Sequence, residues 1–486
     1  MSLLCLSLTE KTLRENLQAV ERYKDFADVL ELRADFLNPS ELEKIRRFPD
    51  MVSDFPVILT VRRKEDGGRF PGSEEERQKL ILRSLKGPFR YVDIEEDLQN
   101  EELPERAKKK EITVIRSFHD FSGVPRDLKE RINRLLDKGE SIPKAAVTPK
   151  STADLAALLE VTKEFSGKKV IILGMGPWGF PSRVLAPVTG MYLSYSSSVA
   201  REAAPGHIDP ETLCRVYRFK EINKDTKLFG IIGNPVYHSY SPVFQNAGFR
   251  KLDLNCLYIP FQVDFPESFL RIGRLLGVQG FSVTIPFKEK IIPFLSEKGG
   301  EVDRIGSCNT VLLRENNWTG RNFDWLGFIK PLRGCFHPDT LKGKKCTIIG
   351  AGGAARAAAY ALTEEGADIL ILNRTPEKAG RLAGEFGGVW GELSEEGCSM
   401  ACDYSDVIIQ TTSVGMAPLT DADPFTGYKF RGSEIVYDLI YIPEETRFLS
   451  RARSAGCRTL NGKKMLLEQG YCQFKEFTGC DYPPDD

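Results

Sequence analysis

The sequence has no long uninterrupted hydrophobic run, almost no net charge and few cysteines close together. Charged residues interrupt each apolar stretch before the roughly 20 residues that a membrane-spanning helix needs. The 67 Lys and Arg residues balance 68 Asp and Glu residues, so a net charge of -1 gives no general attraction to nucleic acid or to an anionic membrane. Among 11 cysteines only Cys398 and Cys402 are near neighbours, which indicates no zinc ribbon and no metal site.

What the sequence does have is length and an ordinary globular composition. At roughly 150 residues per domain, 486 residues predict about three compact domains. Hydrophobic residues at 41% and charged residues at 28% argue against a disordered or low-complexity chain. The opening segment MSLLCLSLTEKTL lacks the basic stretch of a signal peptide, and we expect a cytoplasmic protein.

The first 200 residues alternate apolar strand candidates with amphipathic helical stretches such as STADLAALLEVTKEF. Eight such β/α units predict a (β/α)8 barrel over residues 1–218, which ends at the polar segment RFKEINKDT. The eight strand candidates are LLCLSL, DVLELRAD, PVILTVRR, RYVDIE, EITVIRSFHD, IPKAAVTP, KKVIILGMG and MYLSYSS.

A second series of strand candidates begins at KLFGIIGNP and predicts a domain over residues 227–333. The segment KGKKCTIIGAGGAARAAAYAL then has the strand, glycine-rich turn and helix of a nucleotide-binding fold, which predicts a Rossmann domain over residues 334–459. From about Tyr441 we see no strand alternation. A final helix, at about residues 460–480, is expected to pack back on the middle domain.

The glycine-rich turn matches the pattern GxGxxA at Gly350, Gly352 and Ala355. The first glycine permits the tight turn, the second lets a pyrophosphate approach, and the alanine allows close helix packing. A plain packing turn is the alternative interpretation. The next strand, DILILNRT, ends near Arg374, where an NAD enzyme usually has an acid, so NADP(H) is favoured over NAD. The alternative interpretation is that Arg374 is a solvated surface arginine. The expected cofactor residues are Gly350, Gly352, Gly353, Ala354, Asn373, Arg374 and Thr375.

Six ordered motifs of the second half resemble the shikimate dehydrogenase family: GIIGNPVYHSYSPVFQN, FSVTIPFK, SCNT, GRNFD, YDLIYIPEET and NGKKMLLEQ. The resemblance implies that Ser239 and Ser241 bind the substrate carboxylate. It also implies that Lys288 and Asp324 form the catalytic pair, with the lysine supporting the oxygen of the reduced ketone. Ring hydroxyls would be bound by Thr284, Asn309 and Gln469. Lys290 is taken as solvated, and Gln245 stands where the family usually has His.

Motifs of the first half resemble the type I 3-dehydroquinate dehydratases: ELRAD, TVR, VDIE, SFHD, IPKAAVTP and PSR. The resemblance implies a Schiff base on Lys144, proton transfer by His119 and a carboxylate clamp by Arg183. A lysine that attacks a ketone must lose its proton, which burial or cationic neighbours favour. The other expected substrate residues are Glu31, Arg33 and Arg62, which fall near the carboxyl ends of strand candidates.

Two features of the first half depart from that family. The acidic partner of His119 falls at Asp66, but Glu65 precedes it directly, and either residue fits. In the segment REAAPGH, Ala203 and His207 stand where the family usually has Ser and Gln in a substrate-covering loop.

The expected protein is therefore an α/β enzyme with an N-terminal (β/α)8 barrel, an α/β substrate domain and a Rossmann domain. The resemblances imply that it dehydrates 3-dehydroquinate to 3-dehydroshikimate and reduces that product to shikimate with NADPH. Its expected partners are these small molecules alone. One alternative is an enzyme of quinate or NAD, which an acid at the Arg374 position would favour. Another is a catalytically inactive sensor of such acids, which would have no need of Lys144 or Lys288.

Overall fold

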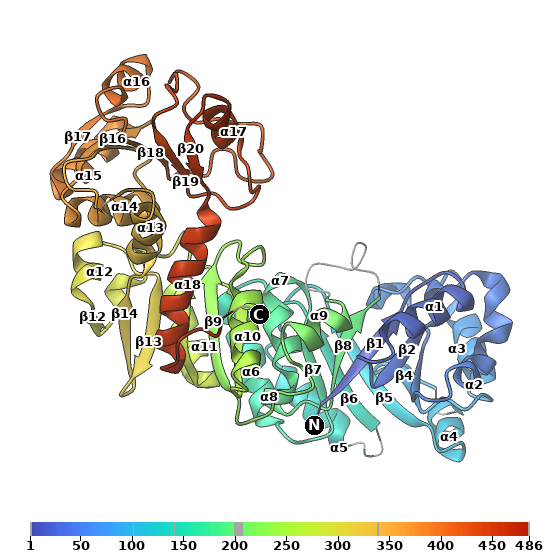
Figure 1. The fold of residues 1–486 in the computed structure, drawn as a ribbon. Coiled ribbons are helices and arrows are strands. Elements are labelled where there is room, and N and C mark those ends of the chain that lie inside the picture. The colour runs from blue at the N-terminus through green and yellow to red at the C-terminus, as the bar shows by residue number, and fades with distance from the viewer. Residues whose placement is uncertain are drawn as a thin grey trace. The chain divides into compact units, whose positions relative to one another are not determined.

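The computed structural model describes residues 2–100, 102–137, 139, 141–198, 208–337 and 340–484. The chain divides into two compact units, Met1–Val278 and Gln279–Asp486. The division falls inside the segment 227–333, so the domain limits derived from the sequence stay a prediction. Figure 1 shows the course of the chain.

The first unit begins with an eight-stranded parallel sheet that curls into a barrel (Figure 1). Neighbouring strands pair around it in the order β7-β6-β5-β4-β3-β2-β1-β8, which leaves a seam between β7 and β8. All eight strand candidates of the sequence become strands. They are β1 Leu3–Leu8, β2 Val29–Arg33, β3 Val57–Thr60, β4 Tyr91–Glu95, β5 Thr113–Asp120, β6 Ser141–Val147, β7 Ile171–Gly174 and β8 Leu193–Ser197.

Helices connect these strands and cover the outside of the barrel. Capping boxes begin α1 at Thr12 and α3 at Ser73, where the side chain accepts from a backbone N–H of the first turn. The helices are α1 Leu13–Tyr23, α2 Phe48–Met51, α3 Glu74–Ser84, α4 Glu102–Lys109, α5 Leu128–Asp137, α6 Thr152–Glu164, α7 Gly176–Val184, α8 Ala186–Thr189 and α9 Pro210–Arg215. Short 3-10 helices lie at η1 Ala34–Phe36, η2 Pro39–Arg47 and η3 Lys64–Asp66.

Strand alternation sorts the barrel residues between two cores. Leu30 and Leu32 of β2 pack in the layer between strands and helices, whereas Val29 belongs to the cluster inside the barrel. In β6 the residues Ile142 and Ala146 lie in that inner cluster. Lys144 has the same parity as these two residues, so the fold directs its side chain into the barrel.

The first unit continues into a β-α-β-α segment: β9 Lys227–Gly233, α10 Ser241–Lys251, β10 Cys256–Gln262 and α11 Pro266–Leu276. Strands β9 and β10 pair in parallel. Buried Asn246 ties α10 to β10 because its amide exchanges hydrogen bonds with the backbone of Tyr258, at 2.7 and 2.8 Å. Gln245 is fully buried in the same helix.

The second unit contains a small mixed sheet followed by a Rossmann domain. Strands β11, β13 and β14 pair in antiparallel fashion, and β12 pairs with β14 in parallel. The elements are β11 Val278–Val283, η4 Ile292–Phe294, β12 Glu297–Lys298, α12 Gly300–Ile305, β13 Thr310–Arg314, β14 Asn317–Arg321 and α13 Asp324–Arg333.

The Rossmann domain is a parallel sheet with strand order β17-β16-β15-β18-β19-β20, whose switch point lies between β15 and β18. Its strands are β15 Lys345–Ile349, β16 Asp368–Asn373, β17 Val389–Glu392, β18 Val407–Gln410, β19 Ile435–Asp438 and β20 Arg458–Leu460. Its helices are α14 Gly353–Glu364, α15 Pro376–Phe386, α16 Glu395–Ala401 and α17 Arg447–Ser454.

The last strand and the last helix complete the second unit. The sequence predicts no strand after Tyr441, and β20 shows that this is wrong; its three residues are too few to display an alternation. Helix α18, Gly462–Thr478, packs against α13 (Figure 1). Buried Gln473 of α18 bonds Ser282 of β11 and the hydroxyl of Thr310, each at 2.9 Å.

Candidate active sites

Lys144 is buried inside the barrel, with only 4% of its surface exposed. Its ammonium donates to Asp93 Oδ2 at 2.9 Å and lies 3.7 Å from Glu31 Oε1. It also lies 4.1 Å from the centre of the Tyr195 ring. These neighbours are acids and an aromatic face, and the cation Arg62 shares Asp93 with Lys144.

Asp93 is the centre of a charge network that the sequence analysis missed. Arg62 reaches Asp93 Oδ1 at 2.9 Å and Glu95 Oε1 at 3.0 Å, and Ser117 donates to Asp93 as well. Burial acts to raise the pKa of Asp93, but Arg62 and Lys144 hold it well below its usual value. The available signal was the strand YVDIE, because two carboxylates in an otherwise apolar, fully buried strand need cationic partners.

His119 lies on β5, two positions beyond the residue that pairs with Lys144. Its Nδ1 lies 3.7 Å from Asp66 Oδ1, which is longer than an ordinary hydrogen bond. Burial and the charge of Arg62 lower the pKa of His119 to about 4, so the imidazole is neutral at pH 7. Burial would raise the pKa of Asp66, but its contacts with His119 and Arg63 lower it to about 2. Glu65 is exposed, so the structure brings Asp66 to the histidine.

Arg183 lies on α7, is 3% exposed and bridges the seam of the barrel. Its Nε donates to the carbonyl of Gly174 on β7 at 3.1 Å, and its Nη1 donates to the carbonyl of Tyr195 on β8 at 3.2 Å. Burial lowers its pKa to about 10. Within the described residues the guanidinium has no carboxylate partner. A buried cation of this kind can bind the anionic group of a ligand.

The two other predicted substrate residues of the barrel, Glu31 and Arg33, both make hydrogen bonds within the protein. Glu31 accepts hydrogen bonds from Ser7 at 2.6 Å and Thr60 at 2.9 Å. Burial acts to raise the pKa of Glu31, but the charges of Lys144 and Arg33 outweigh it and lower the pKa below its ordinary value. Glu31 therefore stays ionised. Arg33 forms a two-point contact with Asp35, at 3.0 and 2.8 Å. Ala203 and His207 lie outside the described residues.

The second unit brings together four of the predicted dehydrogenase residues. Lys288 Nζ donates to Asp324 Oδ2 at 2.5 Å, and Asn309 Nδ2 donates to Asp324 Oδ1 at 2.9 Å. Gln469 Oε1 accepts from the same Asn309 amide at 3.5 Å. Asp324 is 5% exposed, whereas the Lys288 side chain is 21% exposed, so the lysine is the member of the pair open to a ligand.

The other predicted substrate residues lie on loops and helix starts. Thr284 follows β11 and is half-buried. In the first unit Ser241 is the first residue of α10 and is 8% exposed, and its backbone N–H donates to Ser239 Oγ at 3.2 Å. The two serines therefore lie together at the start of α10. The exposed Lys290 has no place in the cluster around Asp324.

The glycine-rich turn has the geometry that a dinucleotide needs. Gly350 has φ +116°, and a Cβ there would lie 2.4 Å from Thr411 Oγ1, so only glycine fits. At Gly352, which precedes α14, a Cβ would meet nothing within 4 Å, so the backbone is open to a ligand. A Cβ at Gly353 would lie 3.7 Å from Lys288 Cδ, so the catalytic lysine candidate lies beside this turn. The turn thus fits a pyrophosphate at the start of α14.

Arg374 follows β16 and is exposed, and no described side chain pairs with its guanidinium. Asn373 donates to the carbonyl of Thr375 at 2.9 Å, which fixes the turn around Arg374. An unpaired guanidinium at the end of the second Rossmann strand fits a 2′-phosphate.

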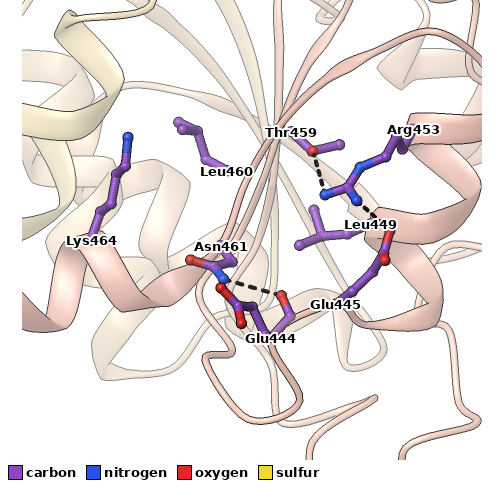
Figure 2. Close-up of a pocket in the computed structure, with 8 residues that line it drawn as sticks. All are labelled: Glu444, Glu445, Leu449, Arg453, Thr459, Leu460, Asn461 and Lys464. Atoms are coloured by element: carbon purple, nitrogen blue, oxygen red, sulfur yellow. Dashed lines mark hydrogen bonds and ion pairs between the residues drawn. The ribbon is translucent and has the colours of Figure 1, made fainter.

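A pocket of about 430 Å³ lies elsewhere on the second unit (Figure 2). Arg453 on its wall is already paired with Glu445 at 3.0 Å and bonds Thr459 at 3.4 Å. No predicted site residue lines this pocket, so it adds nothing to either site. Its lining residues are Glu444, Glu445, Leu449, Arg453, Thr459, Leu460, Asn461 and Lys464.

Two further features are absent from the described residues. No described helix is long and apolar enough to cross a membrane. No three His, Cys, Asp or Glu side chains gather as metal ligands in the part of the chain that the structure describes.

Three family descriptions match consecutive parts of the chain. "Type I 3-dehydroquinase" matches residues 4–224 and "Shikimate dehydrogenase substrate binding domain" matches residues 231–311. "Shikimate / quinate 5-dehydrogenase" matches residues 336–431.

Individual relatives extend this similarity. The bifunctional 3-dehydroquinate dehydratase/shikimate dehydrogenase, chloroplastic, of Arabidopsis thaliana is 34% identical over 482 residues, 94% of this chain and 79% of that protein. The shikimate dehydrogenase (NADP(+)) of Carboxydothermus hydrogenoformans is 40% identical over 271 residues, 54% of this chain and 95% of that one. A crystal structure of shikimate dehydrogenase from Aquifex aeolicus matches with a TM-score of 0.50 and 40% identity, covering 54% of this chain and 96% of that chain.

The fold and the two clusters of side chains define an enzyme of two parts, a lysine-containing (β/α)8 barrel and a Rossmann-type dehydrogenase. The Arabidopsis protein matches across both parts and over most of each chain. This chain belongs to the family of bifunctional 3-dehydroquinate dehydratases/shikimate dehydrogenases. The family and the fold class predicted from the sequence are both confirmed.

Proposed function

We propose that the barrel dehydrates 3-dehydroquinate to 3-dehydroshikimate and that the second half reduces this product to shikimate with NADPH. The observation that carries the first step is an amine, Lys144, buried in the barrel on the strand next to a neutral histidine. The dehydratase is assigned to residues 1–218, substrate binding in the dehydrogenase to 227–333 and the Rossmann domain to 334–459. The helix after residue 460 is assigned to the substrate domain.

In the barrel, Lys144 attacks the substrate ketone as the free amine, and Asp93, 2.9 Å from the amine, orients it. Loss of water gives an iminium, which acidifies the neighbouring C–H. Neutral His119 takes that proton and then delivers it to the departing hydroxyl, which leaves as water. Hydrolysis of the imine releases the product and restores Lys144.

Arg183 is assigned to the substrate carboxylate because it is a buried cation with no acidic partner among the described residues. Arg62, in contrast, is satisfied by Asp93 and Glu95. We assign Arg62 to holding Asp93 in place rather than to direct charge pairing with substrate. Glu31 and Arg33 stay candidates for contacts with the substrate hydroxyls.

In the dehydrogenase, bound NADPH supplies the hydride. Lys288 is placed to donate a proton to the carbonyl oxygen as negative charge develops there, and Asp324 orients the ammonium. Asn309 holds Asp324 and has Gln469 beside it, so both amides are assigned to ring hydroxyls with Thr284. Ser239 and Ser241 stay the proposed carboxylate ligands on the evidence of their motif. Gly350, Gly352, Gly353 and Ala354 would hold the pyrophosphate, and Asn373, Arg374 and Thr375 the phosphorylated ribose.

We also propose a cytoplasmic location. All 11 cysteines are free thiols, which fits a reducing compartment.

Borohydride trapping tests the barrel chemistry. Reduction in the presence of 3-dehydroquinate should link the substrate skeleton to the peptide that contains Lys144, as mass spectrometry of a digest would show, because borohydride reduces an imine to a stable amine. Lys169→Ala, which removes an exposed lysine two residues before β7, serves as the matched control and should label like wild type. Absence of any modified peptide in an active enzyme would contradict the Schiff base.

The reductase is tested separately with supplied 3-dehydroshikimate and NADPH. Loss of NADPH absorbance should accompany the appearance of shikimate in equal amounts. A chain that binds these acids without turnover in either assay would instead support the sensor alternative.

A further inference from the structure

Tyr237 lies in the loop that carries Ser239, and the proposed function does not use its contacts. It lies in the loop between β9 and α10, two residues before Ser239. Its hydroxyl donates to the backbone carbonyl of Pro177, in the first turn of α7. Burial raises the pKa of Tyr237, so the hydroxyl keeps its proton and stays a donor.

The ring of Tyr237 packs on the same helix. Phe180 of α7 meets it edge to face, with ring centres 5.2 Å apart and planes 70° apart. Phe180 is 6% exposed and makes a second edge contact with Tyr217, at 5.6 Å. The tyrosine is therefore held by both ends, the ring by an aromatic contact and the hydroxyl by a backbone carbonyl.

The neighbouring contacts fix the same segment to the barrel helices. The hydroxyl of Thr152, at the start of α6, donates to Asp264 and accepts from its backbone N–H at 3.1 Å. Glu160 of α6 pairs with Arg271 of α11 at 2.6 Å. These contacts hold the backbone around β10 and α11, whereas Tyr237 contacts α7 from the loop before α10.

We propose that Tyr237 is a positioning residue of the dehydrogenase, which sets the turn carrying Ser239 and Ser241 by docking it on α7 of the barrel. This inference rests on the proposed function, in which these two serines bind the substrate carboxylate. The barrel then serves as a support for the dehydrogenase loop as well as a site of its own.

Tyr237→Phe tests this proposal in the full-length chain, because it keeps the ring and removes only the donor. One lost hydrogen bond weakens loop placement enough to raise the KM for 3-dehydroshikimate by about threefold to tenfold. The kcat should stay within about twofold, since a contact made equally in ground and transition states acts on KM alone. The KM for NADPH and the dehydratase kcat/KM should match wild type.

Tyr240→Phe is the matched control, since Tyr240 belongs to the same loop and is 47% exposed. It should behave as wild type. An unchanged KM for 3-dehydroshikimate in Tyr237→Phe, or a fall in kcat with KM unchanged, would overturn the positioning role. The wild type separates this outcome from failure of the proposed function: an inactive wild type refutes the function, and an active wild type with an unaffected variant refutes only the inference.

Discussion

At the scale of single residues, the protonation state of His119 sets how the barrel responds to pH. Burial and the charge of Arg62 lower its pKa to about 4, so the imidazole is a free base above that value and loses this role as pH falls through it. The dehydratase kcat/KM should stay level from pH 7 down to about 5 and fall below that. A pH profile with its acid midpoint near 6.5, the value of an exposed histidine, would contradict this assignment.

The choice of Asp66 over Glu65 is a second residue-scale prediction. Asp66 is buried with its Oδ1 3.7 Å from His119 Nδ1, whereas the Glu65 side chain is exposed. Asp66→Asn should lower the dehydratase kcat by about tenfold to a hundredfold, a part of what acid-base assistance supplies. Glu65→Gln, which makes the same chemical change one position away, should leave kcat unaltered. A larger loss in Glu65→Gln would reverse the assignment.

At the scale of elements, the Arg183 side chain bridges the seam between β7 and β8. The two strands are the ends of the sheet order, and Arg183 donates to a carbonyl of each. Arg183→Leu leaves both carbonyls without that donor, so the barrel should lose about 1–3 kcal/mol in free energy of unfolding. The KM for 3-dehydroquinate should rise as well, because the proposed carboxylate clamp is removed.

Thermal or urea unfolding of the Arg183→Leu variant, followed through the barrel transition, measures the structural part. Arg134→Leu on α5 is the control, since the Arg134 side chain is 63% exposed. A variant with a raised KM and wild-type stability would show that Arg183 binds substrate without supporting the seam.

The turn after β16 carries the prediction on cofactor choice. If Arg374 binds the 2′-phosphate, Arg374→Ala should lose a charge-assisted contact of about 1.5–3 kcal/mol with NADPH and nothing with NADH. The ratio of kcat/KM values for the two cofactors should fall about tenfold to a hundredfold. Both are measured at one salt concentration, with exposed Arg381→Ala on α15 as the control. An unchanged ratio would remove Arg374 from phosphate binding.

The elements also show how far the sequence reaches. All eight barrel strands were predictable because each is an apolar run followed by a helical pattern, and the glycine-rich turn had its strand and helix on either side. Strand β20 was not, because three residues carry no period. Asp93 and its contact with Lys144 were missed because the two residues lie on different strands and are 51 positions apart in the chain. The adjacent acids Glu65 and Asp66 are distinguished only by burial at the 3-10 turn η3, which spacing does not reveal.

At the scale of the whole molecule, the two proposed catalytic groups belong to different compact units. Lys144, His119 and Arg183 lie within Met1–Val278, and Lys288 and Asp324 lie within Gln279–Asp486. No catalytic side chain is shared between the two reactions. A substitution that stops one reaction should therefore leave the other intact when its own substrate is supplied.

The most direct test of the central claim follows 3-dehydroquinate and NADPH through the purified full-length chain, with products quantified over time. Wild type should form shikimate and consume an equal amount of NADPH. Lys144→Ala should leave 3-dehydroquinate unconsumed yet still reduce supplied 3-dehydroshikimate, and Lys288→Ala should accumulate 3-dehydroshikimate with reduction slowed about a hundredfold or more. Lys290→Ala, two positions from Lys288 and exposed, should match wild type. Shikimate formed by Lys144→Ala from 3-dehydroquinate, or both reactions lost together in either variant, would contradict the account.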